Sequence, residues 1–194
     1  MNAYAAIDET ALFDGTGRRK YLTRSEAAAL LAAVRKADPQ TRLFCQLLNL
    51  TGCRISEALA VTRRHLDPET GRVIFRTLKR RKTVYRGVPV PGRFMAELVK
   101  FAATHDADQR LFSWCRQTGW RRVRALMAQA GIEGPQASPK GFRHGYGCHA
   151  IECGLPESLV GRLLGHSSPK STRVYTFVLG PEERELAKRM WVRV

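Results

Sequence analysis

Acidic side chains are scarce in this sequence of 194 residues: 17 Asp and Glu stand against 33 Lys and Arg, which leaves a formal net charge of +16. A surplus of this size repels itself unless a polyanion binds it. Nucleic acid is the commonest such partner, because each neutralised phosphate releases counterions. The charge therefore predicts a nucleic-acid partner, but it does not separate DNA from RNA, so a structural RNA-binding protein fits this observation equally well.

Cysteine pairs and long apolar runs are also missing. The five cysteines are odd in number and form no CxxC pair, so neither a disulfide framework nor a zinc ribbon is predicted. No stretch approaches the roughly 18 uninterrupted apolar residues of a membrane span. The opening MNAYAAIDETALF lacks the basic start and apolar run of a signal peptide. We therefore expect a protein of the reducing cytoplasm, near the nucleoid and without a membrane partner.

The composition that remains is typical of a globular protein, with 44% hydrophobic and 26% charged residues and no internal repeat. The length suits one domain. Helical periodicity dominates, and two β-branched and aromatic stretches flank a basic turn, so the expected fold class is α+β, mostly α-helical with a small antiparallel β-sheet. We expect a flexible basic arm over residues 1–20, a domain over 21–194, strands near 72–76 and 84–90, and helices near 23–38, 40–50, 54–60, 92–104, 117–130, 139–153, 156–164, 169–177 and 181–191.

Arg54 and Glu57 are the first candidate functional pair. They lie three residues apart at a helix start that follows Thr51-Gly52, so they share a helix face. The planar guanidinium of an arginine can bind two phosphate oxygens, and a carboxylate one turn along can hold a neighbouring group in place. An ordinary surface ion pair explains the same two residues.

The basic turn between the two expected strands holds four consecutive cations, Lys79, Arg80, Arg81 and Lys82. Such a turn can enter a DNA groove, and a lysine in it can give a proton to the departing 5′-oxygen of a cleaved strand. General attraction to phosphate explains most of these charges without any chemistry.

Two further cations, Lys140 and Arg143, lie one turn apart at the start of a helix after Ser138-Pro139. They can reach the same anion, and the helix N-terminus adds partial positive charge. His144 follows on a different face, and we expect it to be structural. His166 and Tyr175 complete the set: together with the two arginines they provide a nucleophile and the hydrogen bonds that a pentacoordinate phosphorus requires.

A rival grouping contains His144, Cys148, His149 and Cys153. Their spacing is close to helical, but positions four and five apart on a helix do not converge as tightly as zinc requires, and no common zinc-finger spacing is present. Helix packing explains these residues, so no metal site is predicted.

The order and spacing of these motifs resemble those of the tyrosine recombinase, or phage integrase, family. Arg143 precedes His166 by 23 residues, and His166 precedes Tyr175 by nine. The ordered set is far more specific than any one motif, and it covers most of the chain after residue 20. The resemblance is carried by Thr51-Gly52-Cys53-Arg54-Ile55-Ser56-Glu57-Ala58-Leu59, the basic hairpin ending in Val88-Pro89-Val90-Pro91, Phe142-Arg143-His144, Leu164-Gly165-His166 and Tyr175.

The resemblance implies a catalytic domain that cleaves and rejoins DNA without a metal or other cofactor. Arg54 and Arg143 would clamp the scissile phosphate, and Tyr175 would form a 3′-phosphotyrosyl link. His166 would bind a phosphate oxygen or assist proton movement, and Glu57 would support the site. Lys79 would be the general acid, with Lys82 as the alternative because hairpin length blurs the match, and the expected DNA contacts are Arg80, Arg81, Lys82 and Arg86.

Two departures from the family pattern affect these expectations. Lys140 stands where members most often carry histidine, which puts proton shuttling from that position in doubt, and the related type IB topoisomerases also use lysine there. Members also commonly carry a helical DNA-clamping domain ahead of the catalytic one, whereas only about 20 residues precede the first helix here. Residues 1–20 or an accessory DNA-binding protein would then supply the missing grip. A C-terminal helix over 181–191 would pack on its own domain or on a neighbouring protomer, and the second arrangement predicts a homo-tetramer on paired DNA sites.

The leading hypothesis is thus a site-specific recombinase or integrase, such as mobile genetic elements use, acting on a double-stranded DNA site. The alternatives are an enzyme like the type IB topoisomerases that relaxes supercoils, and an idle DNA-binding regulator with the same fold. An idle regulator predicts loss of a catalytic group, and apart from the lysine at position 140 every expected group is present. The target sequence and the outcome of recombination depend on a few base contacts and on DNA shape, so they do not follow from the sequence.

Overall fold

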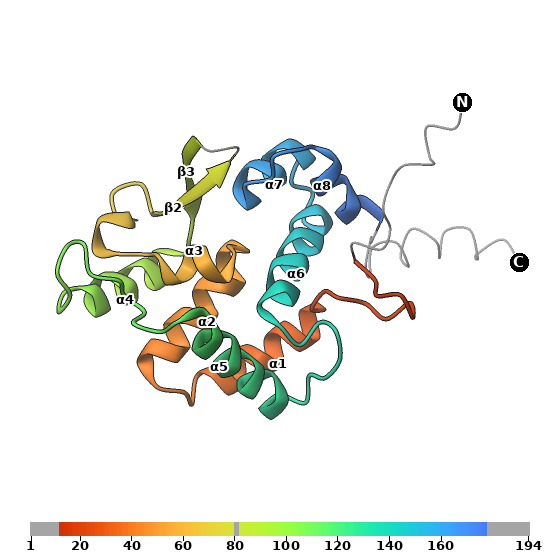
Figure 1. Cartoon of the computed structure of the whole chain (residues 1–194), viewed down its shortest axis with the longest axis horizontal. Coiled ribbons are helices and arrows are strands. Elements are labelled where there is room, and N and C mark those ends of the chain that lie inside the picture. Colours follow the sequence, from red (N-terminus) through yellow and green to blue (C-terminus); the bar gives the residue numbers. More distant parts are fainter. Residues whose placement is uncertain (1–11, 80–81, 178–194) are drawn as a thin grey trace, which may run out of the picture.

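The computed structural model describes residues 12–79 and 82–177. Helices form most of this region, and a small sheet packs at one side (Figure 1). The α+β fold expected from the sequence is confirmed. The helices are α1 (Arg24–Val34), α2 (Pro39–Thr51), α3 (Ile55–Leu59), α4 (Gly92–Ala102), α5 (Arg116–Gln129), α6 (Pro139–Glu152), α7 (Glu157–Leu164) and α8 (Lys170–Arg173), with 3-10 helices at Arg63–His65 and Val174–Phe177.

Local sequence signals explain where the first helices begin and end. Thr23 and Glu26 form the capping box of α1: the Thr23 hydroxyl accepts the Glu26 N–H, and the Glu26 carboxylate accepts the Thr23 N–H. Asp38 caps α2 through its carboxylate, which accepts the Thr41 N–H, and Pro39 takes the first helical position. Helix α2 ends at Gly52, whose φ of 58° lies in the left-handed region that favours glycine. The turn after Gly52 delivers the chain directly into α3.

The sheet is antiparallel with the strand order β1 (Leu66–Asp67), β2 (Arg72–Lys79) and β3 (Lys82–Pro89). Strands β2 and β3 pair from Arg72 opposite Pro89 to Lys79 opposite Lys82. Both strands are longer than the sequence indicated, and the short β1 was not predicted. The pairing places the basic turn at the far end of the hairpin from α4.

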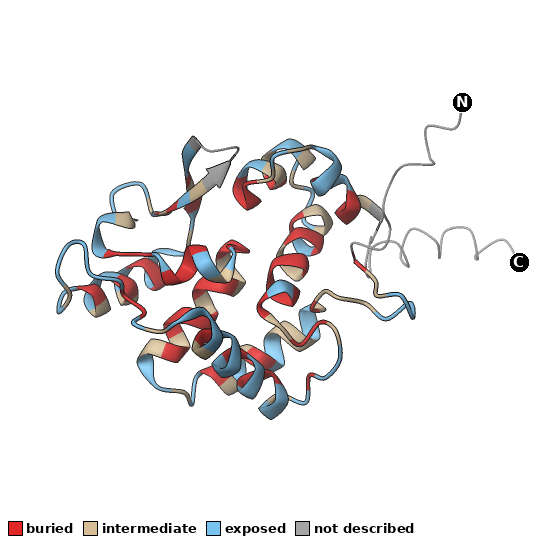
Figure 2. Ribbon diagram, in the orientation of Figure 1, coloured by how far each residue is buried: buried red, intermediate tan, exposed pale blue. Residues whose placement is uncertain are grey.

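Figure 2 shows buried residues in most of the helices, and the buried apolar side chains form two clusters. The larger cluster lies among α1 to α5 and the sheet, where Phe44, Leu47 and Phe112 are fully buried. The smaller cluster joins α6, α7 and the last 3-10 helix, and it contains Leu12, Leu164 and Tyr175. One of the candidate site residues is therefore also part of a hydrophobic core.

Residues 12–20 correct the expectation of a flexible arm over residues 1–20. Leu12 is buried in the smaller cluster, and its carbonyl accepts the N–H of Lys20. Arg19 forms an ion pair with Glu26 of α1. The basic residues suggested a solvated arm, but one apolar side chain and one ion pair fix this segment on the domain.

Residues 1–11 and the predicted helix over 181–191 lie outside the described residues. Within the described ranges, no helix is long and apolar enough to cross a membrane.

Gly52 generates a prediction about stability. A Cβ atom there would meet Leu164 Cδ2 at 2.7 Å and the Tyr146 ring at 2.8 Å. Gly154 also has a positive φ, of 77°, but has nothing within 4 Å. We expect Gly154→Ala to lower the free energy of unfolding by about 1–2 kcal/mol through backbone strain. Gly52→Ala should lower it by about 1–3 kcal/mol more through overpacking. Urea unfolding of the two variants measures the difference, and equal losses would contradict the packing argument.

Candidate active site

Arg54 caps the start of α3, and the Glu57 carboxylate holds it there. Glu57 accepts the Arg54 backbone N–H at 2.8 Å and Arg54 Nη1 at 3.1 Å. The Arg54 side chain is 43% exposed, whereas that of Glu57 is 6% exposed. The carboxylate therefore fixes the backbone and one end of the guanidinium, and leaves the rest of Arg54 open to a ligand.

Glu57 is bound from the other side by Arg86 of β3. Arg86 Nη2 donates to Glu57 Oε2 at 2.7 Å and Nη1 to Oε1 at 3.0 Å, and Nε donates to the Leu163 carbonyl at 2.8 Å. Thr77 of β2 adds a hydroxyl that donates to Glu57 Oε1 at 2.8 Å. Burial raises the pKa of Glu57, but the hydrogen bonds and charge of Arg86 outweigh it and hold that pKa at about 2.

Arg86 corrects the expectation that it contacts DNA. Its side chain is 7% exposed, and its guanidinium is used by Glu57, Thr77 and Leu163. Along β3, Arg86 points to the same side as the buried Val88. It ties the sheet to α3 and α7, so its role is inside the protein.

Arg143 of α6 is the second arginine of the site. Its Nη1 donates to the Gly52 carbonyl at 2.9 Å, so α6 is joined to the turn before Arg54. Its Nη2 is buried without a hydrogen-bond partner among the described residues. Burial and then the charge of Arg54 lower the pKa of Arg143 to about 10. An unpaired guanidinium nitrogen near a second guanidinium is what an anion-binding site presents.

His166 follows the C-terminus of α7. Its Nδ1 lies 2.7 Å from the Thr172 hydroxyl, and its backbone N–H donates to the Gly161 carbonyl. The His166 ring lies 6.0 Å from the ring of Tyr175 at an interplanar angle of 21°. The structure thus brings together the two residues that the sequence placed nine positions apart.

Tyr175 lies in the last 3-10 helix and is 2% exposed. Its ring packs on α6 at Gly147, where a Cβ atom would come within 2.5 Å of the ring. Burial raises the pKa of Tyr175 to about 12, against the opposing charges of Arg143 and Arg54. The phenol therefore carries its proton at neutral pH and lies within electrostatic reach of both arginines.

His144 is buried, and it contacts Tyr175, which the sequence reasoning did not predict. Its Nδ1 lies 3.4 Å from the Tyr175 hydroxyl, and the two rings are 6.0 Å apart. Residues 144 and 147 share a helix face, and the absence of a side chain at Gly147 was the available signal that another element packs there.

The amino-acid sequence matches a known protein family. The sequence profile described as the phage integrase family matches residues 20–179. The chain belongs to this family. It is 32% identical over 173 residues to tyrosine recombinase XerD of Chlorobaculum tepidum, covering 81% of this chain and 57% of the relative. It is 28% identical over 180 residues to tyrosine recombinase XerA of Pyrococcus furiosus, covering 88% and 61%. The chain thus spans about six tenths of the length of these relatives.

Solved structures of phage integrase relatives share the fold. A crystal structure of XerA recombinase aligns with a TM-score of 0.73 at 23% identity, covering 88% of this chain and 64% of that one. XerH site-specific recombinase, in a post-cleavage complex with a palindromic difH substrate, aligns with a TM-score of 0.70 at 21% identity, covering 87% and 52%. These similarities confirm the architecture expected of a tyrosine recombinase catalytic domain.

Lys140 and the four hairpin cations are the remaining predicted residues. Lys140 is exposed on α6, one turn before Arg143. The backbones of Lys79 and Lys82 face each other at the end of the hairpin, but their side chains, with Arg80 and Arg81, lie outside the described residues. The choice of general acid therefore stays a prediction. Across residues 12–79 and 82–177, no three His, Cys, Asp or Glu residues are grouped so as to hold a metal ion.

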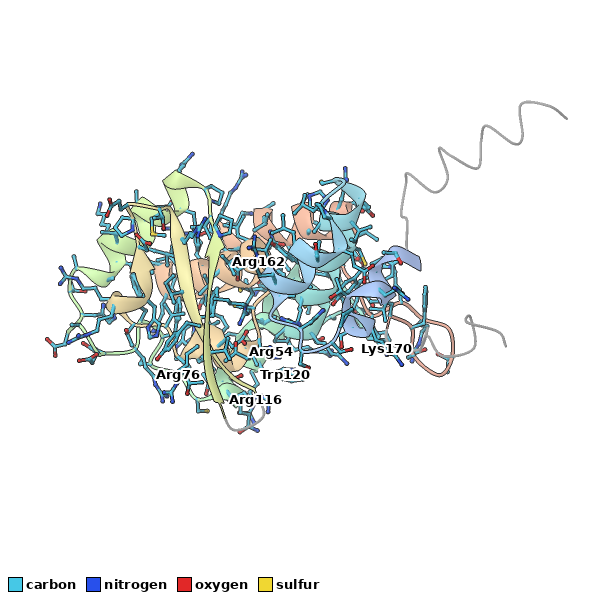
Figure 3. The ribbon with its side chains drawn as sticks, turned by 90° about the horizontal axis from the view of Figure 1, so that it is seen from above. Arg54, Arg76, Arg116, Trp120, Arg162 and Lys170 are labelled. Atoms are coloured by element: carbon cyan, nitrogen blue, oxygen red, sulfur yellow. The ribbon has the colours of Figure 1, made fainter. Side chains whose placement is uncertain are left out.

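An exposed basic edge accompanies the site. Figure 3 shows Arg54, Arg76, Arg116 and Trp120 along one edge of the molecule. Trp120 is 44% exposed, and the Arg124 guanidinium lies 5.3 Å from the centre of its ring. Helix α5, which packs against α3, thus presents cations and an aromatic surface on the same edge as Arg54 in this view.

Glu57 gives this site a pH-dependent contribution to stability. The folded pKa of about 2 lies below the ordinary value of 4.5, so the contribution is present above the ordinary value and lost as pH falls toward 2. We expect up to about 3 kcal/mol of unfolding free energy to disappear across that window. In Glu57→Gln this pH dependence should be absent, and stability at pH 7 should fall by about 3–5 kcal/mol because the Arg86 charge stays buried.

The control for this prediction is Glu97→Gln, which removes a partly exposed carboxylate that pairs with Arg42 and Arg93. Its effect at pH 7 should stay within about 1 kcal/mol. Urea unfolding between pH 2 and pH 7 compares the variants, and an unchanged acid dependence in Glu57→Gln would contradict the assignment to Glu57.

Proposed function

We propose that this chain is a site-specific DNA recombinase that breaks a strand through Tyr175 and rejoins it to a second strand. The single observation that carries the proposal is the unpartnered Nη2 of Arg143, buried next to Arg54 and within electrostatic reach of the Tyr175 phenol. An anion that satisfies this nitrogen lies where the phenol oxygen can attack it. A DNA phosphodiester supplies such an anion.

The cleavage step follows from these positions. Arg54 and Arg143 bind the two non-bridging oxygens of the scissile phosphate and stabilise the charge that grows on them in the pentacoordinate state. The Tyr175 hydroxyl gives up its proton to a base as its oxygen forms a bond to phosphorus, and the bond from phosphorus to the 5′-oxygen breaks. Lys79, or Lys82 in its place, gives the 5′-oxygen a proton, and His166 donates a hydrogen bond to the phosphate.

Rejoining reverses these events. A 5′-hydroxyl attacks the 3′-phosphotyrosyl link, and Tyr175 recovers its proton as it leaves. The number of phosphodiester bonds is unchanged, so no external energy source is needed. Attack by the original 5′-hydroxyl restores the duplex, whereas attack by the 5′-hydroxyl of another strand produces recombination.

The proposed partner is a double-stranded recombination site held in the cytoplasm. The net charge of +16 supports phosphate binding, and XerH is described in complex with its difH site. The basic edge with Arg76, Arg116 and Trp120 extends the contact beyond the scissile phosphate. We further propose a homo-tetramer on paired sites, assisted by an accessory DNA-binding protein.

Covalent capture tests the proposed function. Nicked duplexes should be prepared from inverted repeats found in the DNA around the coding region, so that the short cleaved fragment diffuses away. Wild-type protein is expected to form an adduct that survives denaturant, and Tyr175→Phe should form none while binding DNA normally. An adduct that persists in Tyr175→Phe would exclude this nucleophile, and the absence of any wild-type adduct would exclude the enzyme. Relaxation of a supercoiled plasmid that lacks a second site would instead support a topoisomerase.

The contribution of α5 to DNA binding is tested separately. We expect Arg116→Ala to weaken binding to all duplexes and to reduce the slope of log K against log salt by about 1, as the loss of one phosphate contact does. The matched control is Arg93→Ala on α4, because α4 follows the end of β3 that is remote from the hairpin turn. Fluorescence anisotropy at several salt concentrations measures both slopes. Equal slopes in wild type and Arg116→Ala would remove α5 from the interface.

A further inference from the structure

The hydroxyl of Tyr175 has a buried imidazole as its neighbour. His144 is 8% exposed, and its Nδ1 lies 3.4 Å from the Tyr175 hydroxyl. Its other ring nitrogen, Nε2, is buried with no hydrogen-bond partner in the described part of the chain. A neutral imidazole has one donor and one acceptor nitrogen. With Nδ1 as the acceptor of the phenolic O–H, Nε2 carries the ring hydrogen.

Attack by Tyr175 requires a proton acceptor. Burial raises the pKa of the phenol to about 12, so the nucleophilic oxygen still holds its proton when DNA binds. Lys140, which occupies the position where the family most often has histidine, is an exposed ammonium and has no lone pair to offer. His166 directs Nδ1 at Thr172 and lies nearly parallel to the phenol ring. His144 is the imidazole whose nitrogen meets the phenolic oxygen.

We propose that His144 is a catalytic residue that accepts the phenolic proton as Tyr175 attacks the phosphate, an inference that rests on the proposed function. In the step, the bond from the phenol oxygen to hydrogen breaks and a hydrogen–Nδ1 bond forms. The phenol oxygen then bonds to phosphorus, while the bond to the 5′-oxygen breaks and that oxygen takes its proton from the hairpin lysine. In rejoining, His144 returns the proton to the departing phenol oxygen.

The cations around His144 make its ability to accept a proton depend on whether the substrate phosphate is bound. Burial, followed by the cations Lys140, Arg143 and Lys20, lowers the pKa of His144 to about 3. The imidazole therefore stays neutral, with its acceptor nitrogen available, across the physiological range. A phosphate bound by Arg54 and Arg143 brings negative charge close to these cations and offsets their repulsion of a proton. Proton acceptance by His144 becomes favourable when the scissile phosphate is in place.

Two substitutions separate proton acceptance from simple positioning. In His144→Asn the side-chain amide replaces Nδ1 with a group that can contact the phenol but cannot take its proton. In His144→Leu the contact is lost as well. If His144 is the base, both variants should form the covalent adduct on a nicked duplex at least about a hundredfold more slowly than wild type. DNA affinity should be unchanged. A rate for His144→Asn within about threefold of wild type would overturn the proposal and leave a positioning role.

The chemistry of the leaving group provides a matched control. In a duplex with sulfur in place of the scissile 5′-bridging oxygen, the 5′-thiolate leaves without a proton. This substrate should therefore restore the rate of whichever hairpin variant, Lys79→Ala or Lys82→Ala, lacks the general acid. It should not restore His144→Asn, whose defect lies at the nucleophile. Recovery of His144→Asn on the sulfur substrate would contradict the proposal.

A more acidic nucleophile supplies a readout that a structural role would not change. With 3,5-difluorotyrosine at position 175, loss of the phenolic proton becomes easier. The factor by which His144→Asn slows adduct formation, relative to the protein that keeps His144, should therefore shrink by about tenfold or more. An unchanged deficit would count against proton transfer to His144. If His144→Asn fails to fold, a solvent deuterium isotope effect on wild-type cleavage of the sulfur substrate serves instead, and its absence would overturn the proposal. Failure of wild type to form any adduct would refute the proposed function itself, and is thus distinguishable.

Discussion

The site depends on one buried ion pair, that between Glu57 and Arg86. Its two partners come from α3 and β3, and the same groups bind Thr77 on β2 and the Leu163 carbonyl on α7. Buried charges of this kind stabilise a fold only when their hydrogen bonds are complete. Because Glu57 also holds the Arg54 backbone, the position of the first arginine of the clamp is set by the joint between the sheet and the helices.

The electrostatic character of the site is that of an incomplete cluster of cations. Arg54 and Arg143 repel each other, and burial weakens the charged form of Arg143 further. The protein therefore holds a destabilised arrangement that a phosphate oxygen can complete. Unpaired positive charge binds most tightly to the state of the substrate that carries the most negative charge. In phosphoryl transfer that state is the pentacoordinate one.

The sequence predicted those parts of the site that depend on local spacing. Arg54 and Glu57 share a helix face, and Lys140 precedes Arg143 by one turn, so both pairs could be placed before any tertiary structure was known. The elements also followed local signals, such as the capping box before α1. The structure confirmed the helices and the hairpin within its described residues, with strands longer than expected.

The errors arose where tertiary packing decides. Arg86 lies on the same face of β3 as the buried Val88, but a cation in a basic hairpin was taken to face solvent, since the carboxylate that receives it is 29 positions away. Leu12 is buried by elements from the opposite end of the sequence. The contact of His144 with Tyr175 depends on the approach of the last 3-10 helix to α6, and no spacing within α6 reports what will pack on it.

Gly147 has a consequence for how the molecule behaves between reactions. Because Gly147 has no side chain, the Tyr175 ring packs in the smaller core and contributes to holding α6, α7 and the last 3-10 helix together. The proposed nucleophile is therefore shielded from water. The packing that stabilises this core also fixes the ring in one orientation, so the fold itself keeps the Tyr175 hydroxyl beside His144.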